Sequence, residues 1–247
     1  MIQLDDVVMD YGAHRALDGL RLSVPEGCVY GLLGPNGAGK STTINLVTGL
    51  LRPTSGRITV GGIDAVASPD KARGLLAYVP ESVALYSQLT GIENLQLFSQ
   101  LAGQRLDDQE SSSCLERAGL QVPAHRKRVG AYSKGMRQKV GLAIALAKNA
   151  SAVVLDEPSS GLDPSASHDL ARHVREFAAN GVAVLMATHD LFRARETCDK
   201  VGLLVNGTLR AEWNAAEVKD RDLEAAYLDV VSGRAESAEA AVSQVTR

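Results

Sequence analysis

Residues 34–42 read Gly-Pro-Asn-Gly-Ala-Gly-Lys-Ser-Thr, which fits the pattern G-x-x-x-x-G-K-[ST]. A short apolar run over 28–33 comes directly before this segment, and the apolar residues 44–47 follow it. A buried strand, a glycine-rich loop and a helix in this order are the context of a phosphate-binding loop, because the loop and the first helical turn aim backbone N–H groups at an anion. The segment therefore predicts an α/β fold with a nucleotide site where the strand ends.

The residue types in this loop match the chemistry of nucleotide phosphates. Glycines allow the backbone to wrap around phosphate oxygens, and Lys40 supplies a positive charge to the β- and γ-phosphates. The Ser41 hydroxyl is a ligand for the Mg²⁺ that accompanies ATP. We therefore expect ATP and Mg²⁺ as cofactors. The predicted nucleotide-binding residues of the loop are Gly34, Pro35, Asn36, Gly37, Ala38, Gly39, Lys40, Ser41 and Thr42.

Two further strand ends carry side chains that suit hydrolysis of a phosphoanhydride. The apolar run 152–155 leads into Asp156 and Glu157, and the run 182–187 leads through Thr188 into His189. An acidic pair after a strand is usually only solvated and a single histidine is usually structural, but next to a phosphate loop they gain a function. Asp156 is placed to hold Mg²⁺, Glu157 to polarise the attacking water, and His189 to bond the γ-phosphate and orient that water. The predicted catalytic residues are Glu157, His189 and Lys40.

The order of apolar runs predicts a parallel sheet covered on both faces. The runs 152–155 and 182–186 are short and do not alternate with polar residues, as is typical of strands buried on both sides. Most of the first 80 residues have the patterns of strands and turns, whereas apolar residues recur at helical spacing between about 90 and 150. A strand at 201–205 is followed by Asn-Gly, a hairpin turn.

Charge, hydropathy and cysteine spacing exclude several classes of protein. The chain has 26 Lys and Arg against 29 Asp and Glu, which does not suit a dedicated nucleic-acid binder, so we expect no nucleic-acid partner. No apolar stretch approaches the roughly 18–20 residues of a transmembrane helix, and no signal-peptide pattern is visible at the N-terminus. Cys28, Cys114 and Cys198 are too far apart for a metal-ligand pattern. These features indicate a cytoplasmic protein.

The segments between the phosphate loop and His189 resemble the motifs of one family, the ATP-binding-cassette (ABC) ATPases. The sequence Tyr-Ser-Lys-Gly-Met-Arg-Gln at 132–138 is similar to their signature sequence, LSGGQ, and Ser-Gly-Leu-Asp at 160–163 is similar to their D-loop. His189 stands where the family has its switch histidine, and Tyr11 where it stacks an aromatic ring on adenine. The resemblance runs in the family's order from about residue 2 to residue 210.

This resemblance implies the family's fold, a RecA-like P-loop ATPase core with an antiparallel β subdomain and an inserted α-helical subdomain. It places the ATPase domain at 1–210, with the helical subdomain at about 82–150, and leaves 211–247 as a C-terminal helical or partly disordered tail. It also implies a head-to-tail homodimer, in which each ATP lies between the phosphate loop of one chain and the signature of the other. The additional ATP-binding residues are then Tyr11, Ser133, Gly135 and Asp163, and the Mg²⁺ ligands are Ser41, Glu81 and Asp156.

Two motifs depart from the family's pattern. Glu81 stands where the family usually has a glutamine; a carboxylate still binds Mg²⁺ but cannot donate a hydrogen bond as an amide does. Lys134 and Met136 replace a glycine and a Gln- or Glu-type position of the signature. Lys134 either adds positive charge near the γ-phosphate or points to solvent. We expect altered coupling rather than lost hydrolysis, because Glu157 is present.

The resemblance also implies a partner in the membrane. It predicts an integral membrane permease, contacted through the segment 82–93, and a location at the inner face of the cell membrane. The motifs are most similar to ATPases of ABC-2-type exporters, and among these to the copper-processing ATPase of nitrous-oxide reductase maturation systems, so copper processing or export is one expectation. The alternative is a single-cassette ATPase of an iron–sulfur type cofactor assembly complex, whose partners are soluble.

Overall fold

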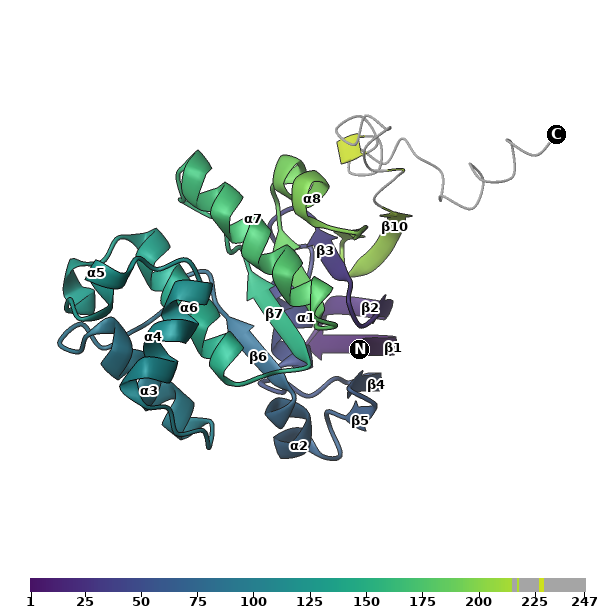
Figure 1. Cartoon of the computed structure of the whole chain (residues 1–247). Coiled ribbons are helices and arrows are strands. Elements are labelled where there is room, and N and C mark those ends of the chain that lie inside the picture. Colours follow the sequence, from purple (N-terminus) through teal and green to yellow (C-terminus); the bar gives the residue numbers. More distant parts are fainter. Residues whose placement is uncertain (215–216, 218–226, 229–247) are drawn as a thin grey trace.

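The computed structural model describes residues 1–214, 217, 227 and 228, which form two β-sheets with helices packed around them (Figure 1). The larger sheet contains, in spatial order, β10 (Thr208–Asn214), β9 (Lys200–Val205), β3 (Val29–Leu33), β8 (Ala183–Thr188), β7 (Ala152–Asp156) and β6 (Leu76–Val79). Neighbouring strands are parallel except β10 and β9, which form the predicted hairpin. The predicted parallel core sheet is confirmed.

The smaller sheet is antiparallel throughout. Its spatial order is β2 (His14–Val24), β1 (Ile2–Tyr11), β4 (Ser55–Val60) and β5 (Ile63–Asp64). The first strand pairs with both of its neighbours along most of its length, so it forms the centre of this sheet. The antiparallel β subdomain expected for the N-terminal segment is therefore present.

Side chains of the larger sheet alternate between two buried cores. On β7, Val153 and Leu155 belong to a core shared with the helices α3, α4, α6 and α7, whereas Ala152 and Val154 belong to a core shared with the smaller sheet and α1. These helices span Lys40–Val47 (α1), Gly91–Leu101 (α3), Asp108–Arg117 (α4), Lys134–Ala147 (α6) and Pro164–Ala179 (α7). Because both faces are covered, the strand shows no alternation of apolar and polar residues.

The helical middle section predicted between about 90 and 150 is confirmed. It contains α3, α4, α5 (Val122–His125), a short 3-10 helix (Val129–Ala131) and α6, which lie together beside β6 and β7 (Figure 1). A capping box starts α3: Thr90 Oγ1 accepts from the Glu93 N–H at 3.2 Å, and the Thr90 N–H donates to Glu93 Oε2 at 2.7 Å. One short helix, α2 (Pro69–Gly74), falls within the segment predicted as strands and turns.

The remaining described helix, α8 (Leu191–Thr197), follows β8. None of the helices that the structure describes has the length and apolar character needed to cross a membrane. The last strand, β10, continues to Asn214 and so spans the expected domain boundary at 210. Most of the expected C-terminal tail, 211–247, lies outside the described residues.

Candidate active site

The predicted phosphate loop lies between the end of β3 and the start of α1. Gly39, with φ +111°, is the N-cap of α1, and no side chain caps this helix, so its first N–H groups are available to an anion. A Cβ at Gly39 would lie 2.9 Å from the Ala16 carbonyl oxygen, and one at Gly34 would lie 2.3 Å from the Leu204 carbonyl oxygen. Neither position accepts a side chain, which explains both glycines.

The side chain of Lys40 lies inside this loop. Its Nζ donates to the carbonyl oxygens of Gly34 at 2.6 Å and Pro35 at 3.2 Å, and lies 4.0 Å from Glu157 Oε1. Burial lowers the pKa of Lys40, whereas the charges of Glu157 and Asp156 raise it. The ammonium group is thus held by oxygen atoms that phosphate oxygens can replace.

The parallel pairing of β7 with β8 brings Glu157 and His189 together. The register pairs Asp156 with Ala187, and the Glu157 N–H donates to the Ala187 carbonyl at 2.9 Å. Glu157 Oε2 lies 2.9 Å from His189 Nδ1 and accepts from the His189 N–H at 3.4 Å. Glu157 has φ +44°, a left-handed conformation that is uncommon for a residue other than glycine. The backbone therefore fixes this carboxylate next to both Lys40 and His189.

The phosphate loop, the β1–β2 hairpin and the end of β7 enclose a pocket of about 360 Å³. Its lining residues are Tyr11, His14, Ala16, Pro35, Asn36, Gly37, Gly39, Lys40, Ser41, Thr42, Glu81, Asp156 and Glu157. Of the predicted loop residues only Gly34 and Ala38 do not line it, and Ala38 is 2% exposed and part of the core. His14 was not predicted from the sequence; it is brought to the pocket by the hairpin register, which pairs it with Tyr11.

The predicted Mg²⁺ ligands Ser41, Glu81 and Asp156 all line this pocket. Burial raises the pKa of Asp156, and the charges of Glu157 and Glu81 raise it further, so a cation beside these carboxylates would relieve their repulsion. Within the described part of the chain, no group of three or more His, Cys, Asp or Glu could hold a metal ion. Mg²⁺ needs only one or two carboxylates when water and phosphate oxygens complete its shell, so these residues fit an ion that arrives with a nucleotide.

The predicted signature and D-loop residues lie elsewhere. Ser133 is the N-cap of α6, where its Oγ accepts from the Met136 N–H at 3.2 Å, and Asp163 is the N-cap of α7, where its Oδ1 accepts from the Ala166 N–H at 2.9 Å. Neither these caps nor Gly135 lines the pocket that contains Lys40. A single chain therefore does not bring the two groups of predicted ATP-binding residues together.

Glu81 reaches from the pocket to the signature segment. Its Oε1 accepts from Ser160 Oγ at 2.7 Å and lies 3.6 Å from Lys134 Nζ. The hydrogen bond from Ser160, followed by the charge of Lys134, lowers the pKa of Glu81. Lys134, whose side chain is 40% exposed, thus pairs with another residue that departs from the family's pattern.

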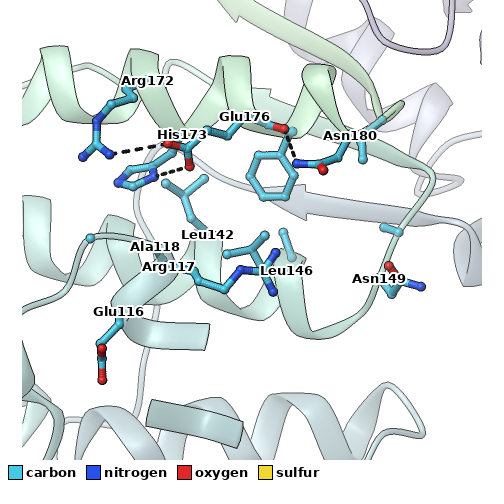
Figure 2. Close-up of a pocket in the computed structure, with 15 residues that line it drawn as sticks. Glu116, Arg117, Ala118, Leu142, Leu146, Asn149, Arg172, His173, Glu176 and Asn180 are labelled. Atoms are coloured by element: carbon cyan, nitrogen blue, oxygen red, sulfur yellow. Dashed lines mark hydrogen bonds and ion pairs between the residues drawn. The ribbon is translucent and has the colours of Figure 1, made fainter. Parts of the chain in front are cut away.

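A second cavity, of about 490 Å³, lies between α7 and the helices α4 and α6 (Figure 2). Three polar residues that α7 contributes to its lining are paired with one another: Glu176 accepts a hydrogen bond from Arg172 at 3.4 Å and lies 3.2 Å from His173 Nδ1. None of the predicted site residues lines it, and it is not next to the phosphate loop. Although larger, this cavity is therefore not the nucleotide site.

Comparison with known proteins agrees with the geometry. The family model described as ABC transporter matches residues 17–160. YdbJ, an uncharacterized ABC transporter ATP-binding protein of Bacillus subtilis, is 35% identical over 231 residues, or 93% of this chain and 74% of the relative. The daunorubicin resistance ATP-binding protein DrrA3 of Streptomyces coeruleorubidus is 38% identical over 220 residues, or 88% of this chain and 69% of the relative.

Solved structures give the same result. The ATP-binding subunit of an ABC transporter superimposes with a TM-score of 0.81 at 31% identity, covering 93% of this chain and 99% of that chain. A dimeric ATP-binding cassette in a post-hydrolysis state, bound to ADP and Pi, superimposes with a TM-score of 0.78 at 25% identity, covering 87% and 99%. The fold is thus that of an ATP-binding cassette.

Proposed function

Because this chain belongs to the ABC transporter family and is an ATPase whose hydrolysis of ATP is coupled to transport, we propose that it powers a separate membrane-spanning exporter subunit. The observation that carries the catalytic part is the contact of Glu157 with both His189, at 2.9 Å, and Lys40, at 4.0 Å. We propose residues 1–210, extended to the end of β10 at Asn214, as the ATPase unit, with the helices between 82 and 150 as its helical subdomain.

Each side chain at the phosphate loop has a role in this proposal. Lys40 and the N–H groups at the start of α1 bind the β- and γ-phosphates, and Tyr11 stacks on the adenine ring. Glu157 accepts a hydrogen bond from the attacking water, and His189 orients that water and the γ-phosphate. Ser41, Asp156 and Glu81 would hold Mg²⁺, which would stabilise the negative charge that develops on the phosphoryl oxygens during hydrolysis.

A second copy of the chain completes each ATP site in this proposal. Ser133 and Gly135 lie at the start of α6, a helix of 14 residues whose N-terminus favours an anion, and Asp163 lies at the start of α7. These residues would contact the γ-phosphate bound to the partner's phosphate loop. Solved relatives of this chain include dimeric cassettes, which supports the same arrangement here. Closure with ATP and reopening after hydrolysis then drive transport.

The segment after Glu81 suits contact with the membrane subunit. The side chain of Tyr86 is 58% exposed. The backbone of Tyr86 is held by the fully buried Asn94, which accepts a hydrogen bond from the Tyr86 N–H at 2.8 Å and donates one to the Tyr86 carbonyl oxygen at 3.1 Å. A large exposed ring on a rigid loop is a good anchor for a partner helix. The chain would thereby lie at the inner face of the membrane.

The direction of transport is proposed from the named relatives. One of them, DrrA3, is a daunorubicin resistance ATP-binding protein, which supports an exporter of the ABC-2 type. Copper processing or export rests only on the short motifs around Glu81 and the signature. Since every residue placed in the pocket acts on ATP, the membrane subunit would select the cargo.

The test is an affinity purification from detergent-solubilised membranes of the source cell. The Glu157→Gln chain is loaded with ATP and used as bait, and the same chain carrying Ser133→Arg as well serves as the control that cannot close. We expect a multi-span membrane protein with the first bait and less of it with the second. Recovery of soluble partners alone would overturn the transporter proposal and support an assembly factor.

A further inference from the structure

One carboxylate connects three segments around the nucleotide pocket. Glu81, which follows β6, accepts from Ser160 Oγ at 2.7 Å and lies 3.6 Å from Lys134 Nζ, and both contacts are made by the same atom, Oε1. Ser160 lies in the turn after β7, and Lys134 is the first residue of α6. The contacts therefore join the end of the core sheet to the signature helix within one chain.

The side chain of Lys134 is positioned by packing against the turn at Ser160 and Gly161 as well as by its charge. A Cβ at Gly161 would lie 3.5 Å from Lys134 Nζ and 3.7 Å from its Cδ, so the lysine side chain runs along the turn. Gly161 has φ +66°, which favours glycine and leaves this space open. With 40% of its side chain exposed, Lys134 is still within reach of solvent and of a competing anion.

The negative charge of Glu81 adds to that of two other carboxylates in the nucleotide pocket. Glu81 lines the same pocket as Asp156 and Glu157, where Lys40 is the only cation among the lining residues apart from a histidine. An uncompensated third carboxylate would repel the phosphates of a nucleotide. A glutamine at this position would need no counter-charge, whereas a glutamate does. Lys134, also unusual for its motif, is the cation that faces it.

We propose that Lys134 and Ser160 are positioning residues that hold the Glu81 carboxylate at the rim of the nucleotide pocket, that Lys134 also neutralises its charge, and that Glu81 leaves these contacts when Mg²⁺ enters with the nucleotide. The inference rests on the proposed nucleotide site. It explains two of the residues that depart from the family's motifs, Glu81 and Lys134, as one matched pair: a carboxylate in the pocket and the cation that compensates its charge.

The test is an equilibrium titration with a fluorescent ADP analogue, once with EDTA and once with Mg²⁺. ADP is used because it has no γ-phosphate to engage a partner's signature. For Lys134→Gln we expect the metal-free Kd to rise about three- to fivefold, the scale of an exposed ion pair. The ratio of the metal-free Kd to the Mg²⁺ Kd rises with it, because the freed Glu81 remains available to Mg²⁺.

Further variants separate this mechanism from a loss of fold. Glu81→Gln with Lys134→Gln should bind metal-free ADP as Glu81→Gln alone does, since no carboxylate is left to neutralise. Lys139→Gln is the matched control: it removes an equivalent lysine from α6, one that pairs with Asp169 at 3.3 Å, and should change neither Kd. Ser160→Ala, which keeps both charges, should show the Lys134→Gln effect at reduced size.

Two outcomes would overturn the inference while leaving the proposed function intact. One is wild-type metal-free affinity in Lys134→Gln and Ser160→Ala. The other is the same loss on removing Lys134 whether residue 81 is glutamate or glutamine, which would show that the lysine does not act through Glu81. A wild-type chain that binds no ADP under either condition would instead refute the nucleotide site itself.

Discussion

The two halves of the proposed ATP site are built in different ways. On the phosphate-loop side, Glu157 follows β7 and contacts both Lys40, at the start of α1, and His189, which follows β8, within one chain. On the signature side, the side chains of Ser133 and Asp163 each bond to the first turn of their own helix. A parallel sheet assembles the first half from distant segments, whereas two helix termini present the second half to another molecule.

This difference separates binding from hydrolysis. The half that one chain completes contains the groups for phosphate binding and for activating water, so nucleotide binding should be a property of the single chain. In the proposed dimer, the half that is left open would supply charge stabilisation only when a second chain closes on it. The reaction would then be controlled at the assembly step, and Glu81, which lines the pocket and pairs with Lys134, would link the two halves inside each chain.

The largest effect should follow from removing the proposed general base, Glu157, while leaving both halves of the proposed ATP site able to bind. Glu157→Gln keeps the size of the side chain but cannot act as a base, so we expect the ATPase rate to fall by about 100-fold or more. ADP affinity should stay within about twofold of wild type. Steady-state phosphate release measures the rate, with the exposed Glu116→Gln as a control for the loss of one negative charge. A variant that kept more than a tenth of the rate would exclude Glu157 as the catalytic residue.

The next test breaks the two halves separately and recombines them. Lys40→Ala disables the phosphate loop and Ser133→Arg blocks the signature, so each chain alone should lose at least about tenfold in rate. An equal mixture should recover about one quarter of the sites, because half of the dimers are mixed and each of these has one intact site out of two. Phosphate release is measured after mixing at a concentration where dimers form.

A mixture no more active than its two components would mean that the halves do not meet across a dimer. Control mixtures of each variant with itself fix the baseline. Binding of ADP should already distinguish the variants before mixing, since it should be lost in Lys40→Ala and retained in Ser133→Arg.

The phosphate-loop half could largely be predicted from the sequence, and the reason is physical. The motif at 34–42 specifies its own local geometry, and strands of a parallel sheet end at a common edge, so Asp156 and His189 had to come close to Lys40. The family resemblance also named Ser133 and Asp163, but as ATP-binding residues and not as the N-caps of α6 and α7 that the structure shows. The sequence could not show the contact of Glu81 with Lys134, which depends on how the loop after β6 packs against the start of α6, 53 positions further along the chain. Nor could it show that His14 lines the pocket, which depends on the register of the β1–β2 hairpin.

A smaller effect should come from the adenine side of the pocket. Tyr11 is 45% exposed at the end of β1, and its ring offers a stacking surface beside the phosphate loop. Tyr11→Ala should weaken ADP binding by about three- to tenfold, which corresponds to about 0.5–1.5 kcal/mol for an aromatic stacking contact. Tyr11→Phe keeps the ring and should bind as wild type. The same loss should appear in a Ser133→Arg background, since this contact belongs to one chain; dependence on Ser133 would contradict the division between the halves.

The smallest effects should be changes in the free energy of unfolding, with one sign for a substitution in the phosphate-loop half and the opposite sign for one in the signature half. Asp156 is a partly buried carboxylate near Glu157 and Glu81, so Asp156→Asn should stabilise the nucleotide-free, metal-free chain by about 1 kcal/mol, as expected where function opposes stability. Ser133 caps α6, so Ser133→Ala should destabilise it by about 1 kcal/mol. Thermal unfolding should then show Tm shifts of about +2 to +4 °C and −2 to −4 °C. If both substitutions lowered Tm, Asp156 would stabilise the fold, which would contradict the repulsion inferred between this carboxylate and those of Glu157 and Glu81.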